Sequence, residues 1–263
     1  MTFLQHLEAL RWHVVRSAIA IVSLAIIAFF QKEFIFDTLI LGPKKPDFPT
    51  YRFLCYLSEK YQLDMCFKEI KFNLISTDIS GQFTMHMWVA FVTGFIIAFP
   101  YFIWEMWRFI KPALSSTEKK YSRGSVFSVS VLFLCGLLFG YYVITPMSIN
   151  FLGNYQVSSD VQNQITLDSY INTVTILSLS AGLVFELPMI VYFLSKIGII
   201  TPEFMRKYRK HAMVVNLILA ALITPSPDIT SQMLVAIPLF LLYEISIYVS
   251  KVVVNRSAKR AAL

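Results

Sequence analysis

The residue with the clearest chemical potential is Glu186, a carboxylate within a long apolar stretch that runs from Ile171 to Lys196. A charged side chain at the centre of a bilayer costs about 2.5 to 3.5 kcal/mol, so it must face protein, water or a cation, or take up a proton. Pro188 follows two residues later; it removes a backbone hydrogen bond and favours a kink that opens carbonyl groups beside the carboxylate. This pattern predicts a functional polar notch in a membrane helix. The alternative is a structural pairing of Glu186 with a neighbouring helix.

Residues for catalysis or metal binding are not grouped in the sequence. The histidines are scattered over at least three regions, and no Cys or His spacing indicates a metal site. There is no serine nucleophile elbow, no phosphate-binding glycine loop and no HExxH motif. We therefore predict neither enzyme activity nor a cofactor. Other acids at unusual positions are Glu8, Glu105, Glu118, Asp228 and Glu244.

The composition indicates a polytopic membrane protein. Apolar residues make up 56% of the 263 residues, charged residues only 15%, and the mean hydropathy is +0.61. A soluble domain of this length rarely carries so many apolar residues. Met1 to Arg16 contains an acid and two histidines and shows no small-residue cleavage site after a short apolar core. We therefore expect the first helix itself to direct insertion.

Apolar length predicts an all-α membrane protein, a single domain of six transmembrane helices. The predicted spans are about 14–30, 86–104, 125–146, 171–194, 212–223 and 233–250. The fifth and sixth are expected to be short, and about 12 residues in the fifth reach only about 18 Å of a roughly 30 Å hydrocarbon core. Either this helix pair thins the bilayer, or the fifth helix extends into the polar residues before it.

The positions of lysine and arginine predict the orientation in the membrane. Most of the 23 basic residues lie near the N-terminus, between spans two and three, between spans four and five, and in the C-terminal tail. The loops 147–170 and 224–232 contain none. Both termini are therefore expected in the cytoplasm, with the protein in the inner membrane. The net charge of +7 suits anionic lipids and gives no support for nucleic-acid binding.

The long segment between the first two spans predicts an extracytoplasmic cap at about 44–71. An amphipathic run from Tyr51 to Ile70 favours one or two helices on the membrane surface. Cys55 and Cys66 lie here, in an oxidising compartment that favours a disulfide, although spacing alone leaves two free thiols as an alternative. Cys135, in the third span, is expected to be an unpaired core residue.

Six stretches occur in a recognisable order along the chain. They are HLEALR at 6–11, LGP at 41–43, FIKPALSSTEKK at 109–120, FELP at 185–188, ITPEFMRKYRK at 200–210, and ITPSPDITSQMLVAIPLFLLYEI at 223–245. Together they resemble the TatC family, the polytopic receptor subunit of the twin-arginine protein translocase, over nearly the whole chain apart from the cap insertion. The resemblance implies six helices in a curved, glove-like arrangement with both termini inside.

The resemblance also implies a docking face for folded precursor proteins whose signal peptide carries an Arg-Arg pair. That face is built from the N-terminal segment and the loop between spans two and three. The corresponding signal-peptide-binding residues here are Glu8, Arg11, Phe109, Pro112 and Glu118. Carboxylates suit the task because they accept bidentate, charge-assisted hydrogen bonds from guanidinium groups.

The first of these stretches departs from the family pattern. The family has an acid at the position of Ala9, whereas the acid here lies one place earlier, at Glu8, which turns the carboxylate by about 100° around a helix. Either Glu8 substitutes from a neighbouring angle, or docking relies on Glu118 alone while Glu8 only favours the helix dipole. Glu118 also completes a capping box that begins at Ser115, which is compatible with a docking role.

Partners follow from the same resemblance. It implies non-enzymatic, energised export with single-span subunits of the TatA/TatB type, and self-association in a larger complex. Glu186, Pro188 and Gln232 are expected to contact a partner helix, with Glu186 as its polar handle. Glu244 forms either a hydrogen bond within the bundle or a partner contact. The alternative function is a proton- or ion-coupled secondary transporter of a small solute with Glu186 and Glu244 as a relay, but the sequence shows no inverted repeat.

Overall fold

The protein is almost entirely helical in the computed structural model, which describes residues 3–62, 72–110, 122–158, 163–224 and 229–261. The exception to the predicted all-α class is a pair of two-residue parallel strands, β1 (Leu74–Ile75) and β2 (Ile165–Thr166). Contacts divide the chain into two compact units. One contains Met1–Gly42, Asn73–Val131 and Gln164–Thr175, and the other contains Pro43–Phe72, Leu132–Asn163 and Ile176–Leu263.

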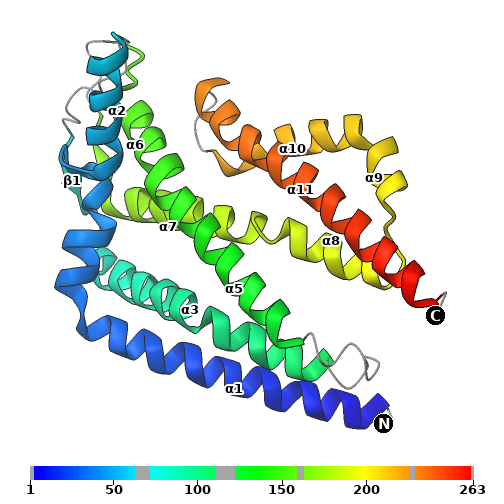
Figure 1. The fold of residues 1–263 in the computed structure, drawn as a ribbon. Coiled ribbons are helices and arrows are strands. Elements are labelled where there is room, and N and C mark those ends of the chain that lie inside the picture. Colours follow the sequence, from blue (N-terminus) through cyan, green and yellow to red (C-terminus); the bar gives the residue numbers. More distant parts are fainter. Residues whose placement is uncertain (1–2, 63–71, 111–121, 159–162, 225–228, 262–263) are drawn as a thin grey trace. The chain divides into compact units, whose positions relative to one another are not determined.

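The first unit is built on an antiparallel hairpin of α1 (Phe3–Phe30) and α3 (Gly81–Ile110), which lie side by side in Figure 1. The two backbones approach closely at Gly94, where an added Cβ would lie 2.5 Å from the backbone nitrogen of Ala25. Small residues allow such an approach, and van der Waals packing then holds two apolar helices together in lipid. The register of the hairpin therefore depends on Gly94.

Polar contacts join the elements at the end of this unit where α1 ends and α3 begins. At one end of the hairpin, Nε2 of His86 hydrogen-bonds the carbonyl oxygen of Phe29 at 3.0 Å, and the two rings stack. The buried Tyr170, in the first turn of α7 (Leu167–Val184), donates its hydroxyl to the carbonyl of Ile40 at 2.9 Å. Ile40 ends a π-helical segment, Phe34–Ile40, so this bond ties the end of the first helical stretch to α7.

The described part of the predicted cap is α2 (Pro49–Tyr61), in the second unit. Proline in the first turn suits a helix start, because the missing N–H would have had no partner there. The buried Tyr51 hydroxyl hydrogen-bonds the carbonyl oxygens of Pro43 and Pro146, each at 2.9 Å. Burial raises the pKa of Tyr51, so the hydroxyl remains a donor over the physiological range. Tyr51 thereby anchors α2 to α6 (Thr145–Asn154).

The cysteines differ in part from expectation. Cys55 is disulfide-bonded. Cys66 lies outside the described residues, so the pairing of these two residues stays a prediction. Cys135 is free but exposed, and the expectation that it belongs to the core is wrong. Apolar length identifies a span, but it does not say which face of the helix points away from the other helices.

Glycines also set the packing of the third helical stretch, which runs from α5 (Ser122–Phe139) through a π-helical segment, Gly140–Ile144, into α6. Gly136 and Gly140 are spaced as in a GxxxG motif and face α7 and the turn after it. An added Cβ at Gly136 would lie 2.6 Å from Cβ of Phe185, and one at Gly140 would lie 2.7 Å from Cβ of Ala181. The crossing therefore requires hydrogen in place of a side chain at both positions.

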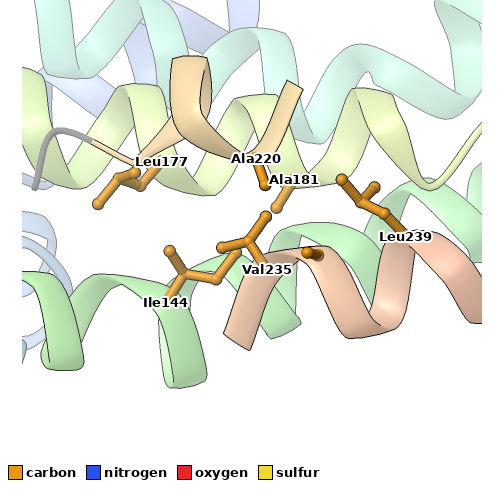
Figure 2. Close-up of a cluster of buried hydrophobic side chains, with 7 residues drawn as sticks. Ile144, Leu177, Ala181, Ala220, Val235 and Leu239 are labelled. Carbon is orange, nitrogen blue, oxygen red and sulfur yellow. The ribbon is translucent and has the colours of Figure 1, made fainter. Parts of the chain in front are cut away.

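The core of the second unit lies where α7 meets α10 (Arg209–Ile223) and α11 (Ile229–Ala261). Figure 2 draws its buried side chains as sticks; the cluster comprises Ile144, Leu177, Ala181, Ala220, Val235, Ala236 and Leu239. Three are alanines, which let the helices approach closely. Two shorter helices, α8 (Leu187–Lys196) and α9 (Pro202–Lys207), complete the unit, and Ser195 on α8 donates to Ser250 on α11 at 2.7 Å.

Five helical stretches in the described part of the chain are long and apolar enough to cross a membrane. They are Glu8–Phe30, Gly81–Ile110, Gly124–Asn154, Leu167–Lys196 and Val235–Asn255. The predicted fifth span, 212–223, corresponds to α10, which has 15 residues and so remains a short helix. The predicted sixth span, 233–250, lies within α11, which has 33 residues and continues beyond it, so its length in the membrane stays a prediction. Lysine ends the apolar run after Ser250 but does not end the helix, since lysine is a good helix former.

Candidate functional site

A polar cluster closes the end of the α1–α3 hairpin opposite His86. Its centre is Glu105 on α3, whose side chain is 1% exposed. One carboxylate oxygen, Oε2, lies 2.5 Å from Nδ1 of His13 on α1. The other, Oε1, accepts hydrogen bonds from the Tyr101 hydroxyl at 3.1 Å and from Nη1 of Arg108 at 3.2 Å. A buried carboxylate is tolerated only when it is paired and hydrogen-bonded, and Glu105 meets that condition.

This cluster could not be predicted from the sequence, which singled out Glu105 only as an oddly placed acid. Tyr101 and Arg108 are four residues before and three residues after Glu105, so helical spacing puts them on its side of α3. His13, however, is 92 positions away. The signal that could have found it is the antiparallel register of the first two spans, which depends on the contact between Gly94 and Ala25.

One predicted docking residue of the first unit, Phe109, contacts this cluster. The Phe109 ring lies edge-on to the His13 ring, with 6.1 Å between centroids. Glu8 and Arg11 are exposed near the start of α1, which lies at the same end of the hairpin as the end of α3 (Figure 1). Pro112 and Glu118 lie outside the described residues, as does the possible capping box.

Glu186 lies at a break between helices. α7 ends at Val184 and α8 begins at Leu187, as the position of Pro188 predicts, because proline has no N–H to donate to the carbonyl of Val184. The N–H of Glu186 instead donates to the carbonyl of Leu183 at 3.1 Å, which tightens the turn. The carboxyl group lies beside the backbone of Phe133 on α5. Its Oε1 atom is enclosed and has no hydrogen-bond partner within the described residues.

The other two residues expected to contact a partner helix have different surroundings. Pro188 is buried, so its effect is to bend the chain at Glu186. Gln232, on α11, is partly buried, and its Nε2 donates to the carbonyl of Leu217 at 3.2 Å.

A small, shallow apolar pocket of about 10 Å³, open to the surface, lies between these positions. Its walls include Val184 and Phe185, which directly precede Glu186, and Val235 and Pro238, which follow Gln232 on α11. The pocket also borders the buried cluster of Figure 2, because it shares Ile144, Ala181, Val235 and Leu239 with that cluster. The second unit therefore combines one enclosed carboxylate oxygen with a neighbouring apolar hollow.

Glu244 forms an ion pair inside the second unit. Its Oε1 lies 2.5 Å from Nη2 of Arg209, and both side chains are about half exposed. This contact favours the structural interpretation of Glu244. Among the residues that the structure describes, no group of three His, Cys, Asp or Glu side chains is placed to hold a metal ion.

Comparison with known proteins decides the family. A family model described as Sec-independent protein translocase protein (TatC) matches residues 5–238. The chain belongs to the TatC family. The TatC protein of Blattabacterium sp. subsp. Periplaneta americana is 42% identical over 253 residues, which is 95% of each chain. The TatC protein of Aquifex aeolicus is 33% identical over 257 residues, which is 97% of each chain.

Two crystal structures of the twin arginine translocase receptor TatC share the fold. One has a TM-score of 0.67 at 31% identity and covers 94% of this chain and 99% of the other. The second, in the detergent DDM, has a TM-score of 0.71 at 32% identity, with 93% and 99% coverage. The predicted family resemblance is thus confirmed. A TatC protein is a membrane-embedded component of twin-arginine protein transport and not a catalytic enzyme.

Proposed function

We propose that this protein recognises Arg-Arg signal peptides of folded precursors at the cytoplasmic face of the inner membrane, and assembles with single-span TatA/TatB-type subunits for export. Besides membership of the TatC family, the observation that carries the proposal is the position of Glu8, Arg11 and Phe109. All three belong to the end of the α1–α3 hairpin that holds the buried Glu105, and Phe109 contacts the His13 partner of that residue. Residues that bind one signal peptide together must lie at the same end of the hairpin, and these three residues do.

The chemistry of that end fits a cationic peptide with an apolar continuation. Glu105 is occupied by His13 and Arg108, so the exposed Glu8 is the carboxylate in the described part of this end that is open to an incoming guanidinium group. Phe109 offers an aromatic edge to the apolar part of the signal peptide. Glu118 supplies the second carboxylate of the proposed site.

The proposed membrane arrangement has six spans in a glove-like, single-domain architecture with both termini in the cytoplasm. α10 is the short fifth span, preceded by the basic residues of α9 and the start of α10, including Arg206, Lys207 and Arg209. Such a cluster of basic residues is expected on the cytoplasmic side.

The partner helix is proposed to dock at Glu186. An enclosed carboxylate oxygen without a hydrogen-bond partner is unfavourable, and a polar side chain from a partner helix would satisfy it. An apolar side chain of the same helix would pack over the shallow pocket between Phe185 and Val235. Gln232 would then take part from α11. Self-association in a larger complex belongs to the same proposal.

Crosslinking of a labelled Arg-Arg precursor to the purified protein tests the docking site. Glu118→Ala is expected to weaken binding by about 1 to 3 kcal/mol, the cost of a lost charge-assisted bond, and Glu118→Lys further by repulsion. Ala9→Glu, which restores the family pattern, is expected to strengthen binding. A Lys-Lys precursor is the control, because lysine lacks the planar fork and should gain little from that change. Unchanged crosslinking in Glu118→Lys would overturn the assignment.

A further inference from the structure

Along one face of α3, the exposed side chains become more polar toward the end of the helix that carries Glu105. Ile97, Tyr101, Trp104 and Arg108 are spaced by four, three and four residues, so they lie in one row along the helix. Ile97 is 56% exposed, Tyr101 37% and Trp104 44%. The guanidinium group of Arg108 lies over the Trp104 ring, 4.8 Å from its centroid, and the Arg108 side chain is 44% exposed. The row thus passes from aliphatic to aromatic to cationic.

α1 carries a matching row. Ile19, Arg16 and Trp12 follow one another at intervals of three and four residues, and all three are exposed. Because α1 and α3 are antiparallel, the side chains of this row also change from aliphatic to polar toward the same end of the hairpin. We call the two rows together the arginine face.

The two rows lie on the same side of the hairpin. On α1 the residues that face α3 include His13 and Ser17, and the row of Arg16 is turned from them by roughly 110°. On α3 the residues that face α1 include Gly94 and Glu105, and the row of Tyr101 is turned from them by roughly 60° in the opposite sense. Arg16 and Arg108 therefore lie on the same side of the hairpin as Tyr101.

We propose that the arginine face binds the headgroup of an anionic phospholipid, with the phosphate between Arg16 and Arg108 and the acyl chains along Ile97 and Ile19. Guanidinium groups hold phosphate through paired N–H donors, and one hydrogen bond to Glu105 leaves other donors of Arg108 for the lipid. Tryptophan and tyrosine prefer the level of the headgroups, which is where Trp104 and Tyr101 would lie.

The charge of the face favours lipid over the signal peptide. Glu105, the acid beside it, is buried and already paired with His13, and the exposed Glu8 lies one helical turn beyond Trp12, outside the two rows. The exposed charges within the two rows are those of Arg16 and Arg108. An Arg-Arg signal would be repelled by them, whereas an anionic headgroup would be attracted. The inference therefore stands apart from the proposed docking of precursors.

Lipid titration of the purified full-length protein tests the inference, with bound lipid counted by native mass spectrometry. Phosphatidylglycerol is expected to bind more tightly than phosphatidylcholine with the same acyl chains. Arg16→Gln with Arg108→Gln should raise the apparent Kd for phosphatidylglycerol roughly 30-fold, and Arg16→Gln alone roughly fivefold. The single variant does not touch the hydrogen bonds of Glu105, so it retains the fold even if the double variant does not.

The matched control is Arg206→Gln with Lys207→Gln, which removes the same charge from exposed positions on α9 and should leave phosphatidylglycerol binding unchanged. Arg16→Lys with Arg108→Lys keeps the charge but loses the paired donors, so its affinity should lie between that of the unmodified protein and that of the double Gln variant. Equal binding of the two lipids, or an equal loss in the control, would overturn the proposal. So would variants of the arginine face that lose precursor crosslinking while they keep phosphatidylglycerol, because the face would then belong to the signal peptide.

Discussion

The buried Glu105 is the residue whose environment differs most from what its type suggests. It is a carboxylate in a mainly apolar helix, and three donors from two helices surround it. Removal of one partner from a buried pair is costly because the remaining charge is left without compensation. The bond between Glu105 and His13 therefore fixes the N-terminal part of α1 to the C-terminal part of α3.

A double-mutant cycle measures this bond. His13→Ala is expected to lower stability by about 3 to 5 kcal/mol, because Glu105 then stays buried with one partner fewer. Added to Glu105→Ala, the same change should cost much less, which gives an interaction energy of about 1 to 3 kcal/mol. Thermal unfolding in a fixed detergent supplies the measurement, and simple additivity of the two changes would contradict the pairing.

Glu186 provides a second prediction at this scale. Glu186→Ala is expected to leave the protein inserted but to weaken capture of a single-span subunit, because no group remains to satisfy the partner's polar side chain. Glu186→Gln keeps hydrogen bonding without the charge and should retain much of the binding. Co-purification in mild detergent measures both. If both variants capture the subunit like the unmodified protein, Glu186 is only structural.

At the scale of elements, glycines and alanines determine which helices meet. Gly94 sets the hairpin of the first unit, and Gly136 and Gly140 set the crossing of α5 with α7. That crossing brings the backbone of Phe133 beside Glu186, so the polar notch depends on the small residues of another helix. Pro188 adds the break, and α7 and α8 together still form one stretch that is long enough to cross a membrane.

Gly136→Ala tests this dependence, with Gly124→Ala as its control in the same helix. An added Cβ at Gly136 meets Phe185 at 2.6 Å, whereas nothing lies within 4 Å of one at Gly124. We expect Gly136→Ala to destabilise the protein by about 1 to 3 kcal/mol through overpacking. Gly124→Ala should be neutral, or stabilising by up to about 1 kcal/mol through helix propensity. Equal melting temperatures for the two variants would show that the crossing tolerates a methyl group.

At the scale of the whole molecule, the proposed orientation rests on the distribution of charge. α11 extends through Lys251 toward Ala261, so the basic C-terminal tail continues the last apolar stretch. The positive-inside rule places such a tail in the cytoplasm, and an even number of spans would put the N-terminus there too.

Labelling of single cysteines checks this arrangement in intact cells. A cysteine placed in the tail of a variant whose three native cysteines are replaced by serine should react with a membrane-impermeant reagent only after the membrane is opened. A cysteine at Asp78, which is exposed between the first two spans, is the control and should react from outside. Labelling of the tail in intact cells would exclude six spans with both termini inside.

Amino-acid sequence alone determined the class, the family and most of the helices of this protein, because the length of an apolar run and the order of short motifs are properties of a continuous stretch of chain. The break at Pro188 was likewise predictable, since a missing N–H acts on its own helix. The tertiary structure decided the pairing of His13 with Glu105, the exposure of Cys135 and the row of residues beside Arg16. Those features depend on which face each helix turns toward its neighbour. In lipid, hydropathy does not distinguish the faces of an apolar helix, and the choice is made by close contacts such as that of Gly94 with Ala25.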